Sequence, residues 1–369
     1  MARLVRVPSV TGDERAAIEL VAELCAEHGI EADVREHDLD ALRADPGHPG
    51  EEAPRAELVG LMAGVGPVGG PRLCLNGHLD VVGPGEIPWD AWSGRVADGY
   101  VHGRGSVDMK AGVVAAIHAM AAVEDPPCEV VLMAVSSEED GGLGTFAALR
   151  EDARFDACLI PEPTAFSLVC ATAGALTFRG VIRGRSAHAA FRLDGESALD
   201  KYVPVHARLQ ELERAMNADV DHPLMAALEL PYPLLVGRVQ AGTWSSQVPD
   251  RLEFEGRVGV PVGGSPAEVR RRLEEAAGDE VEIAWTGGQF GPAETPADHA
   301  FVQRVARHSR GLAGMPYGSD MRQFTERGIP TVMIGPGGLD RVHGVDERVS
   351  VDDVVETAEL IGQTIYAFA

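Results

Sequence analysis

The alternation of helical patterns with short apolar segments constrains the fold of this chain more than any other feature of its sequence. Helical patterns over 109–122 and 143–150 are each followed by an apolar segment of strand length, at 129–135 and 157–160. Strands that take turns with helices are typical of a sheet covered by helices on both faces. The sequence therefore predicts an α/β fold built on a helix-covered, mixed sheet.

The middle of the chain breaks this alternation and predicts elements in the order β-α-β-β-α-β. The strand-like and helical patterns lie at 174–182, 196–217, near Leu234, near Leu252, at 266–277 and at 281–285. This order is that of a small ferredoxin-like α+β sheet. We therefore expect a discontinuous catalytic domain, residues 1–171 and 291–369, and an inserted domain at 172–290.

The charge balance of the chain excludes one class of partner. With 32 basic and 57 acidic residues, the net charge is -25, which repels phosphate backbones and anionic lipid surfaces. The five cysteines are scattered without a CxxC pair, and no apolar stretch is long enough to span a bilayer. We expect no nucleic-acid partner, no membrane partner and a cytoplasmic location.

His78 and Asp80 form the first candidate site. His78 ends an apolar segment of strand length, and period-2 geometry points both side chains to the same face of the strand. A histidine beside a carboxylate suits a metal ligand and the partner that orients it. A surface histidine next to an acid is the alternative for this pair taken alone.

Further acids and a second histidine follow other predicted elements. Asp108 begins a helix behind a glycine-rich loop, where an N-cap role is the alternative, and Glu138 and Glu139 follow a strand. Adjacent carboxylates repel one another unless a cation lies nearby. Nitrogen and carboxylate donors of the kind that zinc accepts are thus available at His78, Asp108, Glu139, Glu162 and His343.

These segments resemble the zinc aminoacylase and acetylornithine deacetylase family, which includes succinyl-diaminopimelate desuccinylases, glutamate carboxypeptidases and dipeptidases. The matched segments occur in the order of the family and span most of the chain. They are GHLDVV at 77–82, GRGSVDMK at 103–110, SEE at 137–139, PEP at 161–163 and HGVDE at 343–347. The resemblance implies a catalytic domain of the zinc-exopeptidase type.

The resemblance also implies a centre of two zinc ions, with cobalt or manganese as alternatives. Asp108 would bridge the two ions. Glu139 and His343 would complete one site, and His78 and Glu162 would complete the other. Two zinc ions, three carboxylates and one bridging hydroxide sum to zero charge.

That charge balance leaves Glu138 outside the ligand set, and the resemblance makes it the general base, with Asp80 orienting the histidine ligand. Zinc lowers the pKa of a bound water to about 7. Glu138 would take its proton as the hydroxide attacks the amide carbonyl, and would then deliver that proton to the leaving amine.

The inserted domain carries one further candidate, His188. The segment GRSAHA at 184–189 resembles a lid segment of the family, whose histidine supports the oxyanion across a dimer interface. We therefore expect a homodimer formed through the inserted domain, with His188 acting in the site of the partner. The alternative is that His188 only caps the loop before the next helix.

Substrate recognition is expected at four positions. Arg257 and Arg322 resemble arginines that hold a substrate carboxylate, and Gly337 lies in a glycine-rich loop that resembles a cradle for the substrate backbone. Ser246 occupies a position where many members of the family have asparagine. This departure bears on which acyl group or carboxylate is accepted.

The sequence thus predicts a deacylase of N-acyl amino acids, of the acetylornithine deacetylase or succinyl-diaminopimelate desuccinylase type. The expected substrate is a small N-acyl amino acid or short peptide. A dipeptidase or carboxypeptidase with the same residues is the first alternative. A metal-free dimeric binding protein is an alternative of another class, although every expected ligand is present.

Overall fold

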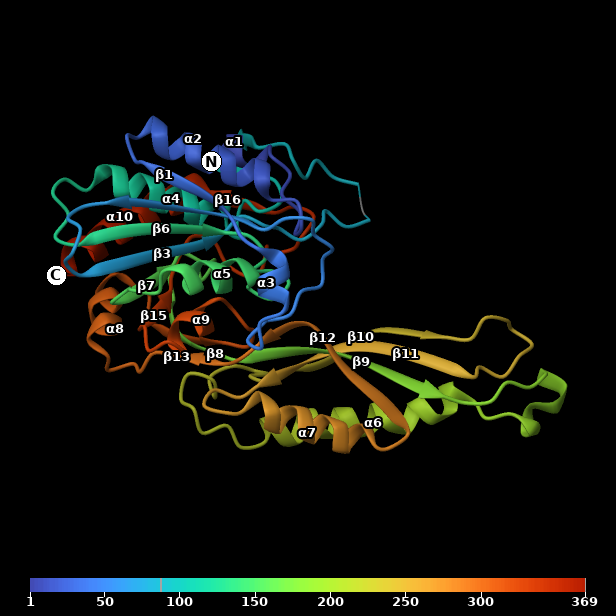
Figure 1. Ribbon diagram of the computed structural model, residues 1–369. Coiled ribbons are helices and arrows are strands. Elements are labelled where there is room, and N and C mark those ends of the chain that lie inside the picture. The colour runs from blue at the N-terminus through green and yellow to red at the C-terminus, as the bar shows by residue number, and fades with distance from the viewer. Residues whose placement is uncertain (87, 369) are drawn as a thin grey trace. The chain divides into compact units, whose positions relative to one another are not determined.

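The computed structural model describes residues 1–86 and 88–368, which divide into two compact units (Figure 1). The first unit comprises Met1–Ala171, Glu294–Ala313 and Ser319–Ala369, and the second comprises Thr172–Ala293 and Gly314–Gly318. Residues 314–318 belong to the second unit, although the sequence pattern placed them in the larger domain. Within the second unit, Ala173 donates its N–H to the carbonyl of Met315 at 2.8 Å.

The first unit is built on a mixed sheet. Within the described residues, the strand order is β1-β2-β6-β3-β7-β15-β8-β13, and β14 pairs with β8. β3 runs parallel to β6 and β7, whereas β2 is antiparallel to both of its neighbours. The strands are β1 Ala32–Glu36, β2 Val59–Val65, β3 Arg72–His78, β6 Glu129–Val135, β7 Ala157–Ile160, β8 Leu168–Thr172, β13 Ala293–Glu294, β14 Leu312–Met315 and β15 Thr331–Met333.

Helices cover both faces of this sheet, which confirms the predicted fold class. Neighbouring residues of β3 show this directly. The Asn76 side chain donates to Thr145 of α5 at 3.0 Å, whereas a Cβ built on Gly77 would lie 2.8 Å from Val113 of α4. Strands that are buried on both faces have nearly continuous apolar sequences, as β6 and β7 do. The longer helices are α2 Arg15–Glu27, α4 Lys110–Ala122, α5 Leu143–Glu151 and α10 Val351–Ala367.

One glycine brings α4 against the loop that follows β7. A Cβ built on Gly112 would lie 2.1 Å from the carbonyl oxygen of Pro161, which is far inside van der Waals contact. Only glycine therefore permits this approach of helix and loop. The close packing fixes the position of Pro161 and, with it, of the residue that follows.

The second unit is an antiparallel sheet with two helices. Among the described residues, its strands are ordered β10-β11-β9-β12. The chain order β9-α6-β10-β11-α7-β12 is the one predicted from the sequence. The bounds are β9 Gly174–Arg183, α6 Ala198–Asn217, β10 Leu234–Ala241, β11 Arg251–Val260, α7 Pro266–Ala277 and β12 Val281–Phe290.

Short elements complete the described structure. Helix α8, Ala300–Val305, is followed by a 3-10 turn, η2, at Ala306–His308. A small sheet of β16, β5 and β4 was not predicted, because each strand has three residues. The remaining bounds are α1 Ala2–Val5, α3 Leu39–Arg43, β4 Arg95–Ala97, β5 Tyr100–His102, η1 Ala189–Asp194, α9 Met321–Thr325 and β16 Arg348–Ser350.

No helix within residues 1–86 and 88–368 is long and apolar enough to cross a bilayer.

Candidate metal centre

Three neighbouring parallel strands bring the candidate residues to one edge of the sheet. His78 is the last residue of β3, Glu138 and Glu139 lie just beyond β6, and Glu162 lies just beyond β7. The carboxyl ends of adjacent parallel strands meet at the same edge, where α/β folds bind ligands. The convergence of these side chains therefore follows from the order of the strands.

The first group of converging side chains is the His78 cluster, made by His78, Asp108 and Glu162. The Nε2 atom of His78 lies 3.1 Å from Oδ1 of Asp108 and 3.8 Å from Oε1 of Glu162. His78 itself is 2% exposed. One imidazole nitrogen and two carboxylates therefore lie close enough together to bind one metal ion.

The second group is the His343 cluster, made by Asp108, Glu139 and His343. The Nε2 atom of His343 lies 3.2 Å from Oε1 of Glu139 and 3.5 Å from Oδ2 of Asp108. Asp108 thus belongs to both clusters, with Oδ1 turned to one and Oδ2 to the other. This is the placement that a carboxylate bridging two ions requires.

The charges of the two clusters are poorly compensated by the protein. Burial and repulsion from Asp108 raise the pKa of Glu162 well above its usual range, and burial also raises that of Glu139. Against the effect of burial, hydrogen bonds with His343 and His78 lower the pKa of Asp108. Hydrogen bonds with Asp108 and Glu139 raise the pKa of His343 to about 10. The raised pKa values of Glu162 and Glu139 report buried, crowded carboxylates that a positive charge would stabilise.

The donors of the two clusters fit two divalent ions. Two imidazole nitrogens and three carboxylates converge, and zinc accepts both donor types. Cobalt and manganese accept the same donors, so this set does not choose among the three metals. The division into two groups that share Asp108 matches the ligand sets expected from the family resemblance.

Asp80 contacts His78 through both its main chain and its side chain. The Nδ1 atom of His78 lies 2.9 Å from the main-chain oxygen of Asp80 and 3.5 Å from its carboxylate. That carboxylate accepts the N–H groups of Glu138 and Glu139, at 3.1 Å each, and the hydroxyl of Thr11. Asp80 is therefore placed to orient the histidine, and its carboxylate also holds the loop between β6 and α5, residues 136–142, which we call the acidic loop.

Glu138 belongs to neither cluster. Burial is the main cause that raises the pKa of Glu138 well above its usual range, and the charges of Asp320 and Glu162 add to the shift. A half-buried carboxylate with a raised pKa, next to a candidate metal centre, suits a group that takes up and returns a proton.

Sequence reasoning missed two buried charged residues, one bonded to the acidic loop and one bonded to the helix α5 that follows it. Arg55 donates to both oxygens of Asp140 at 3.1 Å, with its side chain fully buried. Asp320 accepts from Thr145 at 2.6 Å, and burial raises the pKa of Asp320 to about 6. No spacing in the sequence signals Arg55, which lies in a proline- and glycine-rich loop.

The substrate-binding candidates of the first unit are engaged within the protein. Arg322 is 5% exposed and donates to the carbonyl of Gly141 at 2.7 Å, which supports the end of the acidic loop. Gly337 has a positive φ of 70° and accepts the N–H of Ala165 at 2.6 Å. Their roles toward substrate stay predictions.

The candidates of the second unit lie on its surface. Ser246 and Arg257 are exposed, the latter on β11. His188 is also exposed, and its Nδ1 accepts the N–H of Ala190 at 3.1 Å, which caps η1. Within one chain His188 thus has the capping contact of the simpler interpretation, and its role in a partner stays a prediction.

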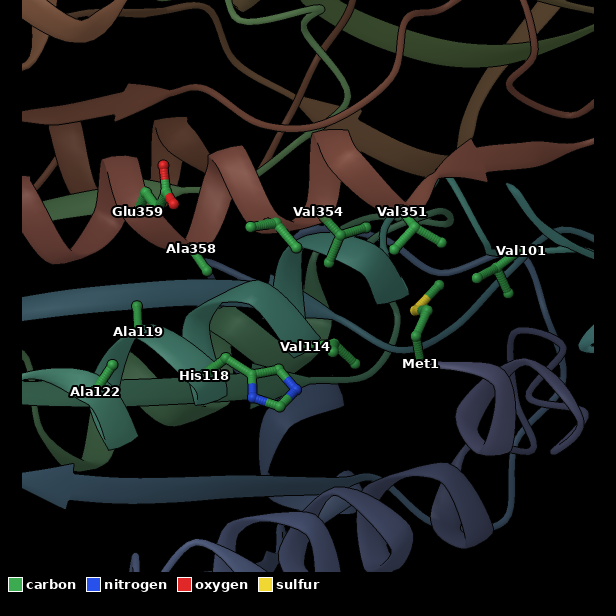
Figure 2. A pocket seen from close by; sticks show the side chains of 11 residues that line it. Met1, Val101, Val114, His118, Ala119, Ala122, Val351, Val354, Ala358 and Glu359 are labelled. Carbon is green, nitrogen blue, oxygen red and sulfur yellow. The ribbon is translucent and has the colours of Figure 1, made fainter. Parts of the chain in front are cut away.

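A cavity of about 470 Å³ lies apart from these clusters, between α4 and α10 (Figure 2). Its lining is largely apolar, with Val114, His118 and Val354 among the side chains. It contains none of the residues predicted to carry chemistry.

Comparison with known proteins gives the family of the chain. The family model of "Peptidase family M20/M25/M40" matches residues 74–367, which include every residue of both clusters. The chain belongs to this family. As a member of the M20/M25/M40 family, it is a metal-dependent hydrolase of amide or peptide bonds.

Three known proteins show what this chain is similar to. A succinyl-diaminopimelate desuccinylase of Methylobacterium radiotolerans is 28% identical, over 99% of this chain and 95% of that protein. The dipeptidase Dug1p of Saccharomyces cerevisiae has the same fold, with a TM-score of 0.77 and 13% identity over 100% of this chain and 95% of that one. A dinuclear metal-binding M20 peptidase of Bacillus subtilis gives a TM-score of 0.65 and 16% identity, over 100% of this chain and 96% of that one.

Proposed function

We propose that this chain hydrolyses the amide bond of N-acyl amino acids with two divalent metal ions and Glu138 as general base. The observation that carries the proposal is the placement of Asp108, whose two carboxylate oxygens face two different clusters. A lone structural metal site would not need a shared carboxylate between two histidines.

His78, Glu162, Asp108, Glu139 and His343 would hold the two ions. When bound, such ions lower the pKa of a water and polarise the carbonyl of the scissile amide.

Proton transfer and positioning are assigned to side chains of the chain itself. Glu138, which is outside both clusters, accepts the proton of the attacking water and returns it to the leaving amine. Asp80 holds the backbone of Glu138 by accepting its N–H at 3.1 Å. The same carboxylate accepts the N–H of Glu139, so one side chain sets the spacing between base and ligand.

The deacylase assignment takes its support from the full-length similarity to a desuccinylase. Arg257 and Arg322 are proposed to bind the carboxylate of the amino acid, with Ser246 and the Gly337 loop contacting the rest of the substrate. Because Arg322 is buried against Gly141, its use would require movement of the acidic loop or of the arginine side chain.

Hydrolysis of dipeptides is the second candidate, and the shared fold with Dug1p supports it. A panel of N-acetyl, N-formyl and N-succinyl amino acids, measured beside dipeptides after zinc loading, separates the two. We expect the highest kcat/KM on an N-acyl amino acid. Activity confined to dipeptides would rule out the deacylase.

We further propose zinc as the working metal and a homodimer through the second unit. Metal analysis after loading with zinc, cobalt or manganese should give two ions per chain. Less than one ion per chain, together with absence of hydrolysis, would favour the metal-free binding protein instead. Sedimentation at several concentrations tests the dimer.

A further inference from the structure

Arg104 and Glu347 form a buried ion pair beside the candidate metal centre. Arg104 donates from Nη1 to Oε2 of Glu347 at 2.7 Å, and the two side chains are 3% and 0% exposed. The pairing of β16 with β5 brings these distant parts of the chain together. Next to that pairing, Gly103 donates its N–H to the carbonyl of Glu347 at 2.9 Å.

Each partner of this pair also holds the backbone of a candidate ligand. Oε1 of Glu347 accepts the N–H of Val107 at 2.9 Å and that of Asp108 at 3.3 Å. Nη2 of Arg104 donates to the carbonyl of His343 at 3.1 Å. The ion pair therefore links the main chain of Asp108 to the main chain of His343.

His343 has particular need of such support. Its φ of 62° lies in the left-handed region, which side chains other than glycine seldom adopt. Its side chain is 47% exposed, so burial contributes little to holding it. The hydrogen bond from Arg104 acts on the carbonyl of this same residue.

The His78 cluster is anchored in a different way. His78 ends the central strand β3, is 2% exposed and has its Nδ1 fixed by the backbone of Asp80. Glu162 follows β7 directly and is 7% exposed. Apart from Asp108, this cluster therefore depends on the sheet and not on the ion pair.

We propose that Arg104 and Glu347 are positioning residues that keep the His343 cluster in the geometry of a metal site. Loss of their link weakens the ion held by the His343 cluster more than the ion held by the His78 cluster. This inference rests on the proposed two-metal function. Neither side chain touches substrate or metal, and both act through the main chain.

Two substitutions distinguish a positioning role of Arg104 and Glu347 from a general role in folding. Arg104→Lys retains the charge opposite Glu347, but a single ammonium cannot reproduce the planar fork that reaches both the carboxylate and the carbonyl of His343. Glu347→Gln retains the shape and one acceptor oxygen while removing the charge. The matched control is Arg183→Lys, because Arg183 pairs with Glu282 at 2.8 Å on the surface of the second unit.

The full-length metal-free protein is titrated with Zn²⁺ alone by calorimetry. We expect two ions for the unmodified chain, and in both variants a roughly 10- to 100-fold weaker binding of one ion, the range seen when outer partners of ligands are changed. Binding of the other ion should change less than about 3-fold, and the control should match the unmodified chain.

A double substitution identifies the weakened site. In a His343→Ala protein only the His78 cluster remains intact, so adding Arg104→Lys should leave its Zn²⁺ affinity unchanged. Equal weakening of both ions, or unchanged affinity for both in Arg104→Lys and Glu347→Gln, would overturn the positioning role. Failure of the unmodified chain to bind two ions would overturn the proposed function itself, and the inference with it.

Discussion

Replacing Glu138 with glutamine separates proton transfer from metal binding. Glu138 lies in neither ligand cluster, and its N–H bond to Asp80 belongs to the backbone. Glutamine keeps the shape of the side chain, so both clusters should keep their geometry. The Glu138→Gln protein should therefore bind the same number of metal ions as the unmodified chain.

The turnover of the Glu138→Gln protein should fall strongly. A positioned acid–base group contributes roughly 10²- to 10⁴-fold to a rate. At about 1.4 kcal/mol per tenfold, this corresponds to roughly 3 to 5 kcal/mol of the activation barrier. Because the group acts in the chemical step, kcat should carry the loss and KM should change little.

In the metal-free protein, the same substitution should increase the stability of the fold. Burial raises the pKa of Glu138 well above its usual range, so ionising this side chain is less favourable in the fold than in the unfolded chain. Glutamine removes that ionisation, and the melting temperature of the metal-free variant should rise.

The assays are turnover of the best N-acyl amino acid, metal content and thermal melting of both proteins. Glu139→Gln is the matched control, since it changes a residue of the His343 cluster and should lose metal. A Glu138→Gln protein that keeps more than a tenth of the normal kcat would refute the role of Glu138 as general base. Loss of a metal ion from it would show that Glu138 is a ligand.

Other parts of the structure predict further outcomes. Gly112→Ala should destabilise the fold by about 1–3 kcal/mol in denaturant titration, since its Cβ would lie 2.1 Å from a carbonyl oxygen, whereas Gly70→Ala, which meets nothing within 4 Å, should be nearly neutral. With its pKa raised to about 10, His343 stabilises the metal-free fold fully below about pH 6.5 and progressively less as the pH rises toward 10. The melting temperature of that form should thus fall from pH 6.5 to 9, and zinc should reduce the fall; a rise would contradict this. If His188 supports an oxyanion in the partner, His188→Ala should lower kcat roughly 10²- to 10³-fold. Mixing it with Glu138→Gln chains should restore turnover, and equal turnover of His188→Ala and unmodified protein would exclude the role.

The regular elements were predictable because their signals are local. The strands at 129–135 and 157–160 and the helix at 266–277 have the bounds that the sequence pattern predicts. Apolar runs, proline at a helix start and glycine after its end act within a few residues. The small β16-β5-β4 sheet lacked such signals, because strands of three residues are defined only by their pairing partners.

The candidate site was predictable in its residue types but not in all of its contacts. The five candidate ligands were identified by their place after strands and by family motifs, and the structure brings them together. The orienting role of Asp80 was assigned to its side chain, whereas the main-chain oxygen makes the shorter contact. The support from Arg55, Arg104 and Glu347 depends on long-range packing, which one sequence does not reveal.

The spread of the ligands along the chain has a consequence for biosynthesis. His78 is made well before His343, although the two share Asp108 as a neighbour. At roughly 5 to 20 residues per second, on the order of tens of seconds separate their appearance. The first unit is completed only by segments made after the second unit, with β15 among them, and domains generally fold as units. We therefore expect neither cluster to hold metal tightly until these later segments of the first unit have been made.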